Sequence, residues 1–222
     1  MSDIFREVDE EVRREKAAQF WNKHQNLIIG LAVLIVVAAG SWRYWQYSTR
    51  TAAEKAGLEF QDAIQLSLGD NEKKKEAAAA FERIAKQGPS GYAVLAKFRA
   101  ANLLEASDKA DAMRAYDAIA ADATTPATLQ DAARLRAAYI AIDTATLDDM
   151  KKRLEPMIAR GRAFRISALE LLALAAIKAQ QYDAATTWLD LLIASPEAPE
   201  SARGRANALQ GLVAGAREFK KG

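Results

Sequence analysis

Hydrophobic and polar residues divide the chain into one apolar run and a long amphipathic remainder. The 18 residues from Gln25 to Trp42 contain no Asp, Glu, Lys or Arg, and most are Leu, Ile, Val or Ala. At 1.5 Å of rise per residue, a helix of this length covers about 27 Å, close to the ~30 Å hydrocarbon core of a bilayer. From Leu27 to Ala39 the run is apolar on every side, whereas a core helix of a soluble domain usually keeps a polar face. The pattern predicts a transmembrane helix over residues 27–45.

Both ends of this run carry side chains suited to a membrane interface. Lys23 and Arg43 can extend their charged ends toward water from opposite ends of the helix. Aromatic residues gather at the same two places and are predicted to form an interface belt: Phe20, Trp21, Trp42, Tyr44 and Trp45. The side chains predicted to face lipid are Leu27, Ile28, Ile29, Leu31, Val33, Leu34, Ile35, Val36 and Val37.

A cleaved signal peptide is the main alternative to a permanent anchor. Ala38, Ala39 and Gly40 would suit a peptidase, but signal peptides normally begin with a short basic segment. Here 26 residues with six acidic side chains precede the apolar run, which favours an uncleaved anchor. The segment before the run carries five basic residues and the first 20 residues after it carry three, which favours a cytoplasmic N-terminus.

From residue 46 onward the sequence predicts helices only. Apolar residues recur with a period near 3.6, alanine is abundant, and no alternating strand pattern occurs. No proline lies between Phe20 and Lys86, so the membrane helix is expected to continue into the first helix of the domain. Turn signals are expected to separate helices of about 14 to 20 residues. They lie at 69–71, 88–89, 107–108, 124–126, 143–144, 161, 180–181 and 195–196.

Part of the helical region repeats. The segments "AAAAFERIAKQGP" (77–89), "AMRAYDAIAADAT" (112–124) and "AATTWLDLLIASP" (184–196) align without gaps, and residues 150–162 align more weakly. Their large residues Phe81, Tyr116, Leu154 and Trp188 are separated by 35, 38 and 34 positions. In stacked helical hairpins a small residue allows close helix approach, and a large residue one turn later fills the groove. The predicted packing residues are Ala77, Phe81, Pro89, Ala112, Tyr116, Leu154, Ala184, Trp188 and Pro196.

This spacing resembles the second helix of tetratricopeptide repeats, in which Ala-x3-Phe is followed by Pro with a period near 34. The first-helix pattern is less well kept, because Leu95 and Arg99 stand where Trp and Gly are usual. Pro156 is expected to shorten or kink its helix. A last helix over 201–219 is expected to cap the stack, with Gly211 and Gly215 at a helix crossing inside the domain. The predicted fold is all-α: a single N-terminal transmembrane helix, a tetratricopeptide-like helical-hairpin solenoid and a C-terminal capping helix.

Residue types argue against an enzyme. The chain has no cysteine, its single histidine is His24 at the edge of the anchor, and no phosphate-binding loop occurs. The carboxylate pairs Asp148/Asp149 and Glu197/Glu200 lie at expected helix starts, where acids satisfy free N–H groups. With a net charge of only +2, the chain has no basic excess for nucleic acid. We therefore expect no cofactor, no metal, no nucleic acid and no small-molecule substrate.

The tail "DEEVRREKAAQFWNKH" and the anchor exit "GSWRYWQ", followed by the repeats, resemble the YfgM family of ancillary subunits of the bacterial SecYEG translocon. The resemblance implies an inner-membrane protein with a cytoplasmic tail (1–26), an anchor (27–45) and a periplasmic tetratricopeptide-like domain (46–222). It implies a chaperone-like role, with the translocon, periplasmic folding factors and exported client chains as partners.

Client contacts are expected on the first helix of each hairpin, which normally lines the concave side of such a stack. The candidate contact residues are Lys97, Asp131, Arg134 and Arg165. In the tail, an apolar stripe of Ile4, Phe5, Val8 and Val12 is expected either to dock on the membrane or a partner, or to belong to a frayed polar helix. A scaffold that links envelope complexes without binding clients, or an enzyme, are the alternatives.

Overall fold

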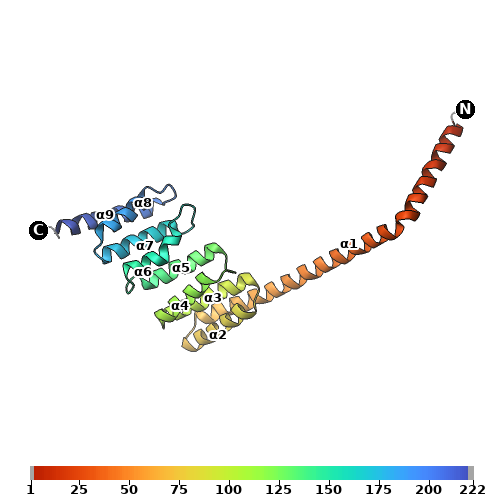
Figure 1. Ribbon diagram of the computed structural model, residues 1–222. Coiled ribbons are helices and arrows are strands. Elements are labelled where there is room, and N and C mark those ends of the chain that lie inside the picture. The colour runs from red at the N-terminus through yellow and green to blue at the C-terminus, as the bar shows by residue number, and fades with distance from the viewer. Residues whose placement is uncertain (1–2, 220–222) are drawn as a thin grey trace. The chain divides into compact units, whose positions relative to one another are not determined.

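The structure is a computed structural model that describes residues 3–219 (Figure 1). Within that range the side chains of residues 3–12, Ala17, Phe20 and Ile28 are not described. The predictions for Phe20 and Ile28, and for the apolar stripe of the tail, therefore lie outside the described residues. The described chain consists of α-helices and one 3-10 helix joined by turns, without strands, which confirms the all-α prediction.

The helices follow the predicted turns, since each turn signal falls at a junction between two helical segments. The helices α4, α6 and α8 are shorter than predicted, with 13, 8 and 12 residues. The elements are α1 (Asp3–Ser67), α2 (Asn71–Gln87), α3 (Ser90–Glu105), α4 (Lys109–Ala121), α5 (Ala127–Ala141), α6 (Leu147–Leu154), η1 (Glu155–Met157), α7 (Arg165–Lys178), α8 (Tyr182–Ile193) and α9 (Glu200–Phe219).

Helix α1 contains both the predicted anchor and the first helix of the domain, as the absence of proline predicted. Of the side chains predicted to face lipid, those that the structure describes are exposed: Leu27, Ile29, Leu31, Val33, Leu34, Ile35, Val36 and Val37. Residues 46–52 are exposed as well, and the first buried residue is Ala56. The chain divides into two units between Glu54 and Lys55, nine residues beyond the boundary expected at 45/46.

Local signals explain where the second helices α2, α4 and α6 begin. Asp70, Asp108 and Thr146 precede α2, α4 and α6, and each side chain accepts a hydrogen bond from the backbone N–H three residues later, at 3.0, 2.9 and 3.2 Å. Such caps satisfy N–H groups that have no partner inside the helix. Pro89 and Pro126 stand immediately before α3 and α5, where a proline costs no helical hydrogen bond.

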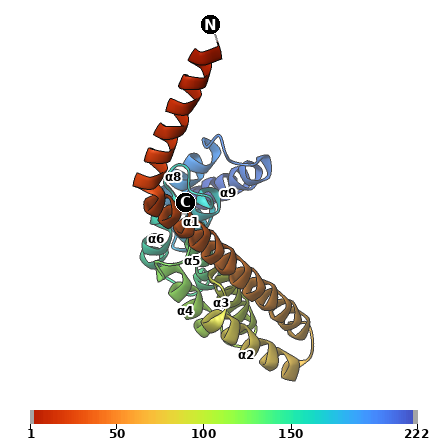
Figure 2. The same ribbon diagram turned by 90° about the vertical axis from the view of Figure 1, so that its right-hand side faces the viewer.

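Helices α2 to α9 pack in chain order, each against the next (Figures 1 and 2). The core is correspondingly divided along the stack. One cluster joins the end of α1 to α2 and α3, a second joins α3, α4 and α5, and a third joins α5 to α9. Because each hairpin contacts mainly its neighbours, the domain has the architecture of a helical-repeat stack.

The repeated large residues are buried in the equivalent place in successive hairpins. Phe81 packs edge-on against Phe60 of α1, with ring centroids 5.5 Å apart, and Tyr116 packs against Phe98 of α3 at 5.9 Å. Such aromatic pairs stabilise a core beyond the area that they bury. The predicted packing residues that are buried are Ala77, Phe81, Ala112, Tyr116, Leu154 and Trp188.

Three predicted packing residues are less enclosed than expected. Pro89 is half-buried and Pro196 is exposed, because both lie in turns at the edge of the stack. Ala184 is half-buried, whereas the next residue, Ala185, is fully buried. The close-packed small residue of α8 is therefore Ala185, one position later than the alignment placed it.

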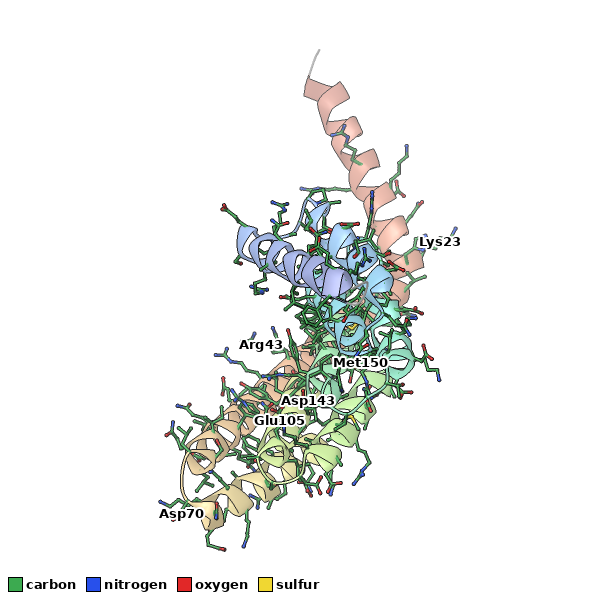
Figure 3. All side chains as sticks on the ribbon, turned by 90° about the vertical axis from the view of Figure 1, so that its left-hand side faces the viewer. Lys23, Arg43, Asp70, Glu105, Asp143 and Met150 are labelled. Carbon is green, nitrogen blue, oxygen red and sulfur yellow. The ribbon has the colours of Figure 1, made fainter. Side chains whose placement is uncertain are left out.

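The third hairpin differs from the others at Pro156, as predicted. Helix α6 ends at Leu154, and residues 155–157 continue as the 3-10 helix η1 because a proline ring cannot be accommodated deeper in an α-helix. Leu154, Met150 and Met157 are fully buried, so the short helix still fills the core. Met150 is labelled in Figure 3, among the packed helices.

Helix α9 closes the stack, but its glycines do not lie at an internal crossing. Ala202, Ala206 and Val213 form its buried face. Gly211 and Gly215 are exposed, and a Cβ atom at either position would meet no atom within 4 Å. The expectation that they allow a helix crossing inside the domain is wrong, because they lie on the opposite side of the helix from its buried face.

Candidate interaction surface

Two of the predicted contact residues take part in ion pairs within the stack. Lys97 on α3 donates from Nζ to Asp122 Oδ2 at 2.8 Å, just after the end of α4. Arg134 on α5 donates to Asp131 Oδ1 at 2.9 Å and to the carbonyl oxygen of Ala120 at 3.1 Å. Both side chains remain partly exposed, at 36% and 27%. A direct contact between either residue and a client stays a prediction.

The other two predicted contact residues are enclosed. Asp131 is 2% exposed, and its carboxylate accepts from Arg134 and from Arg162 Nη2 at 2.6 Å. Arg165 is 8% exposed and donates to the carbonyl oxygen of Ile158 at 2.7 Å, to Ser195 Oγ and to Glu197 Oε1 at 2.9 Å. The structure therefore corrects the expectation that Asp131 and Arg165 reach a bound segment.

Basic residues of the first helices share a structural role that the sequence did not reveal. Arg134, Arg165 and Arg203 each donate to a backbone carbonyl near the end of a preceding helical segment: Ala120, Ile158 and Ser195. The last carbonyls of a helix have no partner within it, and a nearby cation also favours the negative end of the helix dipole. These arginines hold successive hairpins together.

Other side chains of the first helices point away from the core. Leu95 on α3 is 44% exposed and Tyr139 on α5 is 51% exposed. Arg99 and Arg136 are also exposed, and neither makes a hydrogen bond or ion pair with the described part of the chain. We call these four residues the first-helix face. It combines apolar and basic groups that make no hydrogen bond or ion pair with the described residues, which suits contact with another protein.

The first helices of the later hairpins also adjoin one another, and the capping helix α9 follows them. Helix α5 contacts α7, and α7 contacts α9. Arg205 on α9 makes a bidentate ion pair with Glu170 on α7, at 2.6 and 2.8 Å. Hydrogen bonding to Glu170 raises the pKa of Arg205, and Tyr139 on α5 contributes in the same direction. These contacts extend a surface of first-helix side chains from α5 to α9.

Several titratable groups in the stack have structural partners. Burial and the hydrogen bond to Glu105 Oε1, at 2.6 Å, raise the pKa of Tyr116 well above its usual value. Hydrogen bonds from Lys97 and Thr124 hold the pKa of Asp122 well below its usual range. Asp149 accepts from the Thr146 hydroxyl at the start of α6. Among the described residues, no group of three or more His, Asp or Glu side chains could hold a metal ion.

Helix α1 is a candidate membrane anchor. The segment from Ile29 contains a window long and apolar enough to cross a membrane, and none of that window is buried. Lys23 and Arg43, both labelled in Figure 3, are the charged residues on either side of its uncharged run. Trp42 and Trp45 are exposed, with ring centroids 5.6 Å apart, and Trp21 and Tyr44 are exposed as well.

Comparison with known families identifies the fold. Residues 18–171, well over half of the 222-residue chain, match the tetratricopeptide repeat-like domain family. The chain belongs to this family. The match begins within α1 and ends within α7, so the tetratricopeptide-like prediction is confirmed for the hairpins that it covers. No curated protein and no solved structure matches the chain. Tetratricopeptide repeat-like domains generally serve as interaction scaffolds, and the exposed side chains described above suit that role.

Proposed function

We propose that this protein is a non-enzymatic interaction protein of the bacterial inner membrane that acts as an ancillary subunit of the SecYEG translocon. The observation that carries the proposal is an exposed, uncharged helical run joined to a tetratricopeptide repeat-like domain in one chain. The acidic and basic tail and the aromatic exit of the anchor, which resemble the YfgM family, support the choice of the translocon.

The proposed topology has residues 1–26 in the cytoplasm, residues 27–45 in the membrane and residues 46–222 in the periplasm. The excess of basic residues before the span supports this orientation. A helical run of exposed Leu, Ile and Val side chains would be costly in water, and lipid would remove that cost. The aromatic belt would lie at the two polar interfaces.

In this proposal the anchor concentrates the domain near chains that emerge from the channel. Tethering raises the effective concentration of a weak binding surface without any new contact. The first-helix face would bind exposed segments of newly exported chains, because Leu95 and Tyr139 offer apolar area and Arg99 and Arg136 offer unpaired charge. Weak binding permits release, as a chaperone-like role requires.

Site-specific photo-crosslinking in native membranes tests this function. One probe replaces Val33 in the anchor and a second replaces Tyr139, which is exposed and makes no hydrogen bond that its loss would break. We expect translocon subunits at Val33 and many exported chains at Tyr139. A matched control probe at Lys74, an exposed residue of the second helix α2, should yield few exported chains.

Two results would oppose the proposal in different ways. One fixed partner at both positions, with no exported chains, would favour a scaffold that links envelope complexes. Crosslinks from Val33 that lack every translocon subunit would remove SecYEG as the partner, whatever the probe at Tyr139 captured.

A further inference from the structure

A groove lies at one edge of the stack, among the start of α7, the end of α8 and the start of α9. It has a volume of about 860 Å³ and is also lined by residues 160–163, 194–197 and Pro199. None of the four residues of the first-helix face lines it, but Glu170 and Arg205, whose ion pair continues the surface of first-helix side chains to α9, do. The groove is large enough for several side chains of another molecule.

The groove is lined by more basic than acidic side chains. Arg160, Arg162, Arg165 and Arg205 face two carboxylates, Glu170 and Glu197. Arg165 is buried, and its guanidinium already donates hydrogen bonds to Ile158, Ser195 and Glu197, so its role is structural. Of the other three arginines, Arg162 pairs with Asp131 and Arg205 pairs with Glu170, so the arginine of the groove without an ion pair to the described residues is Arg160.

The three arginines other than Arg165 are not equally available to a ligand. Arg160 is exposed and makes no hydrogen bond or ion pair with the described residues. Arg162 uses Nη2 for Asp131, and its Nε–H, which has no acceptor among the described residues, is buried and out of reach of a ligand. Arg205 is bound to Glu170 and is still 57% exposed. Guanidinium groups favour carboxylates, which can accept two parallel hydrogen bonds.

Apolar side chains lie beside these charges. Leu191 is 43% exposed on α8, and Ile166 and Ala194 line the same groove. The groove thus pairs a basic rim with an apolar wall, which matches a chain segment that carries both carboxylates and an apolar residue. Nucleic acid fits less well, because no aromatic side chain lines the groove for base stacking and two carboxylates would repel phosphates.

We propose that this groove binds an acidic peptide segment of a protein partner, with carboxylates on the arginine rim and an apolar side chain against Leu191. The inference deepens the proposed interaction function and rests on it for the kind of partner. It adds a second surface to the first-helix face, with its own preference for negative charge.

Fluorescence anisotropy with the full-length protein in phosphatidylcholine nanodiscs tests the proposal. The probe is a short fluorescent peptide with Glu on both sides of one Leu, and the control peptide has Gln in place of every Glu. We expect the Glu peptide to bind more tightly and to lose affinity as salt rises, because the contacts on the rim are charged and exposed. Equal affinity for the two peptides would overturn the proposal.

Matched variants locate the binding. Arg160→Glu should weaken binding of the Glu peptide by about tenfold, since it replaces an attractive charge with a repulsive one. Arg83→Glu makes the same charge change at an exposed residue of α2, outside both the groove and the first-helix face, and should change affinity by less than about twofold. Leu191→Gln should weaken both peptides. Equal losses in Arg160→Glu and Arg83→Glu would mean non-specific attraction and would refute the groove.

The remaining outcomes separate this inference from the proposed function. Binding to anionic vesicles that depends on Arg160, without binding of the peptide, would assign the groove to lipid headgroups and overturn the peptide proposal. Loss of peptide binding with exported chains still crosslinked at Tyr139 would refute the groove alone. Peptide binding without translocon or exported-chain crosslinks would retain the groove and reject the proposed cellular role.

Discussion

Replacing Arg165 by Met tests whether this residue is structural, as its burial indicates, rather than a contact for clients. The side chain donates to the carbonyl oxygen of Ile158 and to Ser195 Oγ, and it joins the loop after η1 to the end of α8. Met keeps most of the aliphatic volume and removes every donor. A hydrogen bond to a charged donor contributes about 1.5 to 3 kcal/mol, but Met avoids the cost of burying the guanidinium. We expect a loss of about 2 to 3 kcal/mol in the free energy of unfolding.

The assay is thermal unfolding of the full-length protein in detergent, measured by differential scanning calorimetry. For a domain of this size, 1 kcal/mol shifts Tm by roughly 2 to 4 °C, so Arg165→Met should lower Tm by about 4 to 12 °C. The control is Arg160→Met, which removes an exposed arginine from the same loop and should cost less than about 0.5 kcal/mol. An unchanged Tm in Arg165→Met, together with lost client crosslinks at Tyr139, would refute the structural role.

Two further predictions concern α7 and Tyr116. Gln180 has a φ of 56° at the end of α7, a conformation that suits glycine, so Gln180→Gly should raise stability by about 0.5 to 1 kcal/mol. Gln61→Gly, inside α1, should lower stability by about 1 kcal/mol. If urea unfolding showed that both substitutions change the free energy of unfolding in the same direction, the argument would be refuted. The raised pKa of Tyr116 stabilises the fold below about pH 10, where the phenol is protonated in both states. The free energy of unfolding should therefore fall as pH rises above that value, and more steeply than in Tyr116→Phe; parallel pH curves would contradict this prediction.

Signals within a few residues determined the helix boundaries. Asp70, Asp108 and Thr146 cap helices that begin at the next residue, and Pro156 ends α6 where its ring would clash. The repeat register was also readable, because Phe81, Tyr116 and Leu154 are large side chains at equivalent positions and all are buried. The uncharged run predicted an anchor-length helix for the same reason: absence of charge is a property of consecutive residues.

Which charged residues are available to a partner depends on tertiary packing and could not be predicted from the sequence. Lys97, Asp131, Arg134 and Arg165 look alike in the sequence, yet two are buried and all four have internal partners. Their partners lie up to 32 residues away in the chain, so pairing depends on how hairpins stack. The same limit applies to Gly211 and Gly215, whose small size predicts a close contact but not on which side of α9 it would occur.

Capping, periodicity and hydrophobicity act over one or two turns, so the helices, their repeat and a candidate anchor could be predicted from the amino-acid sequence alone. The packing of the hairpins places Arg134, Arg165 and Arg203 against helix ends. It also brings Arg160, Leu191 and Arg205 to one groove. These residues come from different elements, and the free energy that orients each side chain depends on neighbours that only packing supplies.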